Sequence, residues 1–158
     1  MTVYLVRHGS AGARNDTDPH DVERHLDTDG REQANRLVQL LTGRPIGRIL
    51  SSPAARCQET VAPLAQDRSL DVEVNEALLE GTDIAESWEF VTWAARQQHD
   101  IALCSHGDVI PELIRRAQGR GMEVPGKSGC SKGSCWELTW SGTEFTSGKY
   151  TPLKKPLS

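Results

Sequence analysis

The chain has 158 residues, of which 37% are hydrophobic and 25% charged, an ordinary balance for a globular protein. This length favours one domain over residues 1–158, and the formal net charge of −4 argues against a generally basic nucleic-acid binder. No charge-free stretch approaches the roughly 18–20 apolar residues of a membrane span, so we expect neither a nucleic-acid nor a membrane partner.

Cysteine usage and the amino terminus favour a cytosolic protein. The four cysteines include no Cys-x-x-Cys pair, which predicts reduced thiols and neither a disulfide framework nor a zinc ribbon. The first residues lack the basic and then apolar pattern of a secretory leader. We therefore expect a cytoplasmic location.

Strand and helix patterns alternate along the first two thirds of the chain. Apolar or alternating runs predict strands at 2–7, 48–51, 71–75 and 101–104. Helical spacing and capping residues predict helices that begin near Asp29, Ser52-Pro53, Asp83 and Asp108. Pro63 is expected to kink or shorten the second helix. This order predicts an α/β fold, in which a mostly parallel sheet lies between two helical layers as a three-layer αβα sandwich.

The end of the chain has a different pattern. Residues 119–133 are rich in glycine and are predicted to be irregular. Alternation at 135–140, a Ser141-Gly142 turn and a further run at 143–150 predict an antiparallel hairpin at the edge of the sheet.

Histidine and arginine follow three of the predicted strands. Arg7 and His8 end the first, Arg56 lies one helical turn beyond the second, and His106-Gly107 follows the fourth. Because ligands bind at the carboxyl ends of the strands in open α/β sheets, we expect these side chains to meet.

This set of side chains suits a phosphoryl group. Arginine offers a planar, permanently charged fork of donors that matches phosphate oxygens. A neutral imidazole can attack phosphorus, while the second imidazole, if protonated, binds the developing charge. A leaving alcohol also needs a proton, and either Glu80 or Glu76, both close after the third strand, could reach the same edge.

Four motifs in this order resemble the histidine phosphatase superfamily, which has the phosphoglycerate-mutase-like fold. They are Leu-Val-Arg-His-Gly at 5–9, Leu-x-x-x-Gly-x-x-Gln-Ala at 26–34, Ser-Ser-Pro-x-x-Arg-x-x-x-Thr at 51–60 and Ser-His-Gly at 105–107. The resemblance extends through nearly the whole chain. The short length and the pattern Asp21-x-x-Arg24-x-Leu26 are more like the compact branch, with bacterial phosphohistidine phosphatases and phosphatase domains attached to Nudix hydrolases.

The resemblance implies a phosphatase with a phosphohistidine intermediate on His8 and neither metal nor cofactor. Arg7, Arg56 and His106 would form the phosphate pocket, and Glu80 falls where many members carry a proton donor. Further substrate contacts are predicted at Ser10, Asn15, Arg24 and Gly107.

The substrate stays open at this point. A nucleotide, a sugar phosphate and a phosphohistidine protein all present similar oxygens. Two rival functions also stay open: a module that binds a phosphorylated ligand with little turnover, and a phosphoglycerate mutase. The mutase is disfavoured by the length and by the loop after His8, where Ser10 stands in place of the glutamate of the mutases and Asn15 lies one position late.

Overall fold

The computed structural model describes residues 1–13 and 17–153, and its centre is one six-stranded sheet with strand order β3-β2-β4-β1-β5-β6. The strands are β1 (Thr2–Arg7), β2 (Ile46–Ser51), β3 (Val72–Val74), β4 (Asp100–Ser105), β5 (Cys135–Trp140) and β6 (Phe145–Thr151). β1 to β4 run parallel, whereas β5 pairs antiparallel with both β1 and β6. The predicted edge hairpin is confirmed.

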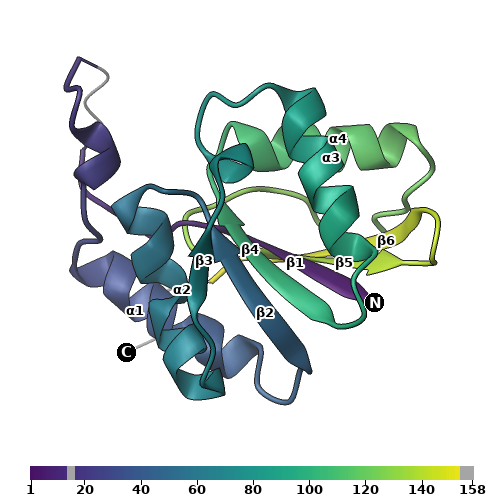
Figure 1. Cartoon of the computed structure of the whole chain (residues 1–158), viewed down its shortest axis with the longest axis horizontal. Helices are drawn as coiled ribbons and strands as arrows, with labels where there is room; N and C mark the ends of the chain where they lie inside the picture. Colours follow the sequence, from purple (N-terminus) through teal and green to yellow (C-terminus); the bar gives the residue numbers. More distant parts are fainter. Residues whose placement is uncertain (14–16, 154–158) are drawn as a thin grey trace.

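Within residues 1–13 and 17–153, four α-helices cover the two faces of this sheet. They are α1 (Thr28–Leu40), α2 (Ala55–Arg68), α3 (Ile84–Ala95) and α4 (Val109–Gly119), with short 3₁₀ turns η1 (Asp21–Glu23) and η2 (Glu76–Leu78). α1 packs beside α2 and α3 packs beside α4, and Figure 1 shows the two pairs on opposite sides of the sheet. The predicted three-layer α/β architecture is confirmed.

The sheet separates the two larger clusters of the core, and β1 shows why. Val3 and Leu5 belong to the cluster beneath α3 and α4, whereas Tyr4 and Val6 belong to the cluster beneath α1 and α2. Successive side chains of a strand point to opposite faces, so a strand buried on both faces is apolar at every position. The continuous apolar run of β1 follows from its central place.

Two predicted capping residues are wrong. The N-cap of α1 is Asp27, whose carboxylate accepts a hydrogen bond from the Gly30 N–H at 2.9 Å, and not Asp29. α2 begins at Ala55 with Ala54 as its N-cap, and not at Ser52. The Ser52 hydroxyl oxygen accepts from the Ala54 N–H at 3.2 Å, ahead of the helix, and is also bonded to His106 at 2.8 Å.

Pro63 lies inside α2 and does not end it, since the helix continues to Arg68. Helix α2 packs against β2, β3, β4 and α1. Because tertiary packing supplies most of the stability of a helix in a protein, it can outweigh the one backbone hydrogen bond that proline removes.

Candidate active site

Parallel pairing of β1 with β4 brings two histidines together. Arg7 lies opposite Ser105 in the register, so the residues that follow, His8 and His106, leave the sheet side by side. Their ring centroids are 5.4 Å apart, with the ring planes at 63°. The His8 N–H also donates to the Ser105 carbonyl at 3.1 Å, which fixes the end of β1 against β4. The expected meeting of the strand ends is present.

His8 is buried and held in one tautomer. Its Nδ1 lies 2.8 Å from the Gly9 carbonyl oxygen, which can only accept a hydrogen bond, so Nδ1 carries the proton and Nε2 carries the lone pair. The pKa of His8 is lowered to about 3, chiefly by burial and also by the neighbouring His106, Arg56 and Arg7, against the opposing effect of the Gly9 hydrogen bond. The imidazole is therefore neutral at physiological pH.

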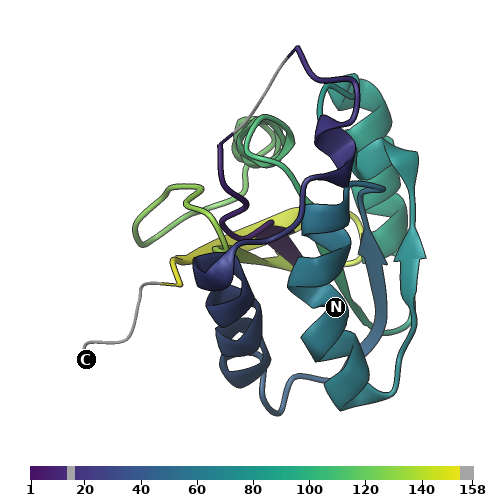
Figure 2. The ribbon, with the colours of Figure 1, turned by 90° about the vertical axis from the view of Figure 1, so that its left-hand side faces the viewer.

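Arg56, in the first turn of α2, connects three parts of the site although its side chain is only 2% exposed. One terminal nitrogen, Nη2, lies 3.3 Å from a carboxylate oxygen of Glu80 and 3.4 Å from Nδ1 of His106. The other, Nη1, donates to the Asp21 carbonyl at 3.1 Å. Figure 2 shows η1, which carries Asp21, beside one end of α2.

The tautomer of His106 follows from these contacts. A guanidinium only donates, so Nδ1 of His106 accepts from Arg56 and Nε2 carries the proton. That proton is donated to the Ser52 hydroxyl oxygen, at 2.8 Å. The thiol sulfur of Cys57 lies 3.5 Å from the same Nε2. His106 is thus oriented from both sides of its ring.

Arg7 is held against Gly107. Its Nη1 donates to the Cys130 carbonyl at 2.6 Å. The Nε groups of Arg7 and Arg56 are buried, and within the described residues they find no hydrogen-bond acceptor. Buried donors are nearly always paired, so we expect these two N–H groups to donate hydrogen bonds to a bound anion.

A cavity of about 290 Å³ opens over these side chains. Its walls hold three guanidiniums, one ammonium and two carboxylates. The lining residues are Arg7, His8, Gly12, Arg24, Arg56, Glu80, Gly107, Asp108 and Lys132. Such a polar and mainly cationic cavity suits a phosphate group better than an apolar ligand.

The predicted site residues divide into those that line the cavity and those that do not. Six of them line it: Arg7, His8, Arg24, Arg56, Glu80 and Gly107. His106 lies directly behind, in contact with Arg56. Ser10 does not line the cavity, because its hydroxyl donates to the Asp27 carboxylate at 2.6 Å. Asn15 lies outside the described residues.

The two candidate acids, Glu80 and Glu76, differ in their position relative to the cavity. Glu80 lines the cavity and contacts Arg56. Glu76 is exposed in the first turn of η2 and is not part of the cavity wall. Glu80 is therefore the better placed of the two to exchange a proton with a bound substrate.

Two charged residues of the cavity wall are not among the predicted site residues. Asp108 follows the Ser-His-Gly motif directly, and its carboxylate accepts from the Gly81 N–H at 2.8 Å, which ties the turn after Glu80 to the start of α4. Lys132 comes from the glycine-rich segment before β5, and in the sequence it belongs only to a diffuse group of basic residues. The place of Asp108 after a predicted strand end was the available signal.

Comparison with known proteins assigns the family. The model of the histidine phosphatase superfamily (branch 1) matches residues 3–93. The chain belongs to this superfamily. Among the residues that the structure describes, no helix is long and apolar enough to cross a membrane.

A curated relative matches almost all of the chain. It is an "8-oxo-(d)GTP phosphatase" of Mycolicibacterium smegmatis, 33% identical over 153 residues, which are 94% of this chain and 47% of the relative. An uncharacterised Mycobacterium tuberculosis protein, Rv0525, is 37% identical over 62 residues, or 39% of this chain and 31% of that protein. The histidine phosphatase described here thus spans half or less of the length of these relatives.

Solved structures share the fold. The protein histidine phosphatase SixA complexed with tungstate has a TM-score of 0.73 at 20% identity, covering 96% of this chain and 94% of that one. A mycobacterial glucosyl-3-phosphoglycerate phosphatase, Rv2419c, complexed with VO₃, has a TM-score of 0.70 at 17% identity, covering 91% and 95%. These likenesses show that the chain shares the fold of both proteins.

Proposed function

We propose that this histidine phosphatase is a metal-independent phosphomonoesterase in which His8 is the nucleophile. The observation that carries the proposal is the state of His8: its Nδ1–H is committed to the Gly9 carbonyl, its pKa is about 3, and it lies among guanidiniums. A neutral imidazole with its lone pair on Nε2 is the form that can attack phosphorus.

In the first step Nε2 of His8 bonds to phosphorus while the bond from phosphorus to the leaving oxygen breaks. That oxygen takes a proton from Glu80. In the second step water attacks the phosphohistidine, Glu80 accepts a proton from it, and inorganic phosphate and neutral His8 are restored. The atoms and charges balance over the two steps, and Glu80 ends in its starting form.

Positive charge for the transferred group comes from side chains. Arg7 and Arg56 are proposed to bind the phosphoryl oxygens, with Arg24 and Lys132 at the outer wall. His106, whose Nδ1 accepts from Arg56, is proposed to position that guanidinium in the phosphate pocket. Catalysis of phosphoryl transfer depends mainly on positioning and on stabilising charge spread over these oxygens. The unused Nε donors of Arg7 and Arg56 support this role.

We propose a phosphorylated small molecule as substrate, with a nucleotide as the first class to test. The relative that is 33% identical to this chain carries the name 8-oxo-(d)GTP phosphatase, which supports this class. The sequence also leaves sugar phosphates and phosphohistidine proteins open, and kcat/KM for these should be compared with kcat/KM for nucleotides.

The decisive experiment measures phosphate release by the wild type and by His8→Ala, followed by trapping of the wild-type intermediate with ³²P-labelled substrate and an alkaline quench, because the N–P bond of phosphohistidine is labile in acid. We expect wild-type turnover, a ³²P label on His8 and no turnover by the variant. If His8→Ala turned over substrate as fast as the wild type, His8 would not be the nucleophile. Tight binding without phosphate release by the wild type would instead favour the binding module.

A further inference from the structure

A second cavity of about 300 Å³ lies between α4 and the segment that precedes β5. Most of its wall is apolar, and polar groups are confined to a few positions. The lining residues are Pro111, Ile114, Arg115, Gln118, Ser128, Gly129, Cys130 and Trp136. Ligand sites in proteins have this character, with apolar walls and a small number of polar groups that orient the ligand.

Cys130 lies at the boundary of the two cavities. Its carbonyl accepts the hydrogen bond from Arg7 in the phosphate cavity, at 2.6 Å, and the same residue lines the second cavity. The start of α4 is also shared, because Asp108 lines the first cavity and Pro111 the second. Three residues of helix advance the chain by about 4.5 Å. The second cavity is therefore next to the place that a leaving group would occupy.

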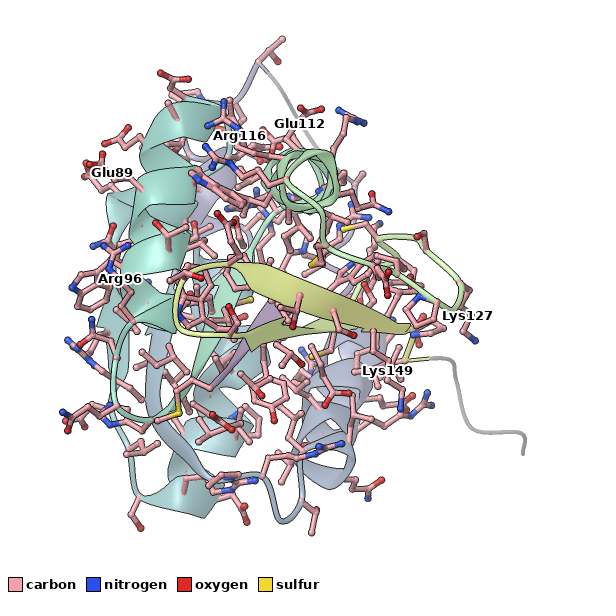
Figure 3. The ribbon with its side chains drawn as sticks, turned by 90° about the vertical axis from the view of Figure 1, so that its right-hand side faces the viewer. Glu89, Arg96, Glu112, Arg116, Lys127 and Lys149 are labelled. Carbon is pink, nitrogen blue, oxygen red and sulfur yellow. The ribbon has the colours of Figure 1, made fainter. Side chains whose placement is uncertain are left out.

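The wall that carries Cys130 is held on both sides. The Trp136 indole N–H donates to the Gly129 carbonyl at 3.0 Å, and the Ser131 N–H donates to the Tyr150 hydroxyl oxygen at 2.9 Å. Gly129 packs so closely on the Tyr150 ring that a Cβ at position 129 would lie 2.9 Å from it. Figure 3 shows this segment, marked by Lys127, extending beside the β5–β6 hairpin. A wall held in this way is formed before a ligand binds, which lowers the cost of binding.

We propose that this cavity binds the base of a nucleotide whose phosphate is attacked by His8. This inference rests on the proposed phosphatase function and narrows its substrate class. The walls of Pro111, Ile114 and Trp136 suit a flat aromatic ring, whose faces pack on apolar side chains. The Gln118 amide and the Ser128 hydroxyl can hydrogen-bond to the edge of a base.

The first test compares two substrates that differ only by the base, guanosine 5′-monophosphate and ribose 5-phosphate. We expect kcat/KM to be at least tenfold higher for the nucleotide, and calorimetry with His8→Ala to show at least tenfold tighter binding. Equal values for the two substrates in both measurements would overturn the base site. Phosphate release from ribose 5-phosphate at the same kcat/KM would leave the phosphatase proposal standing and overturn only this inference.

The second test fills the cavity from its exposed rim with Ser128→Trp and uses Lys127→Trp as the matched control. Residues 127 and 128 are both exposed, but only Ser128 lines the cavity. Acetyl phosphate, whose leaving group has no ring, is the reference substrate. We expect Ser128→Trp to lower the ratio of kcat/KM for guanosine 5′-monophosphate over acetyl phosphate at least tenfold, and Lys127→Trp to change it less than twofold.

Three outcomes of these tests separate the two proposals. An unchanged ratio in Ser128→Trp would overturn the base site. A similar loss in both variants would overturn it as well, because the effect would then not depend on the cavity. If the wild type releases no phosphate from any of the three substrates, the phosphatase proposal fails, and the calorimetric comparison alone then decides whether the base is bound.

Discussion

Gly107 lies against the guanidinium of Arg7, so closely that a Cβ at position 107 would be 2.7 Å from Cζ of Arg7. No real Cβ contact is this short, so any side chain at 107 displaces the guanidinium. The Ser-His-Gly motif therefore ends in glycine because the end of β4 and the end of β1 share this space.

The first prediction concerns this contact. We expect Gly107→Ala to lower kcat/KM about 10- to 100-fold, or by about 1.4–2.7 kcal/mol of transition-state stabilisation, because Arg7 moves away from the phosphoryl oxygens. The melting temperature should change little, since the displaced atoms are the far end of a flexible side chain. Gly119→Ala is the control, because a Cβ there meets nothing within 4 Å. Unchanged kcat/KM in Gly107→Ala would contradict the role of this contact.

The second prediction concerns the protonation of His8. Because burial lowers its pKa to about 3, the Cε1–H resonance of His8 should not titrate between pH 5 and 8. This resonance is assigned to His8 because it should be absent from the spectrum of His8→Ala. A titration midpoint near 6.5 would show that the ring is not held neutral.

The same pKa predicts how stability depends on pH. The folded pKa of about 3 lies below the unfolded value of about 6.5, so the unfolded chain binds a proton first as the pH falls. The contribution of His8 is thus complete above pH 6.5 and declines between about 6.5 and 3, by up to about 1.4 kcal/mol per pH unit. Denaturant unfolding should show a shallower decline in His8→Ala over this range.

The third prediction separates the two candidate acids. Glu80→Gln should lower the rate of phosphoryl transfer to His8, measured in a single turnover, about 10²- to 10⁴-fold for alkyl phosphates, whose leaving oxygen needs a proton, and much less for p-nitrophenyl phosphate. Glu76→Gln should stay within twofold on both substrates, since Glu76 lies outside the cavity wall. An equal loss on both substrates in Glu80→Gln would argue for a binding role rather than proton transfer.

The fourth prediction concerns the loop after His8. The Asp27 carboxylate caps α1 through Gly30 and also accepts from the Ser10 hydroxyl and the Gly12 N–H. Asp27→Ala should lower the free energy of unfolding by about 1–2 kcal/mol. Asp29→Ala, which removes a carboxylate from the same turn without removing the cap, should cost less than half of this. Equal losses would contradict the assignment of the cap.

The cap also has a predicted pH dependence. The Ser10 hydrogen bond, followed by that of Gly30, lowers the pKa of Asp27. Its stabilisation is therefore present above the unfolded pKa of about 4 and is lost as the pH falls through the lower folded value. The difference between wild type and Asp27→Ala should narrow below about pH 4 in denaturant unfolding.

Local patterns in the chain determine the elements and their order. The continuous apolar run of β1 and the alternation of β5 predict strands because burial on two faces and on one face require different periodicities. The same patterns place Arg7, His8 and His106 at strand ends, and the topology of an open parallel sheet then brings them to one edge. The prediction of these strands, and of the residues at their ends, depends on residues within a few positions of one another.

The partners of each side chain were decided only by the tertiary structure. Ser52 has the local chemistry of an N-cap, but its hydroxyl is bonded to an imidazole 54 positions later. Ser10 lies next to the nucleophile in sequence, but its hydroxyl is directed to Asp27. A short polar side chain has several partners of similar energy, and which of them it meets depends on how segments far apart in the chain pack. The same reason explains why Asp108 and Lys132 join the cavity wall, although neither belongs to the predicted site.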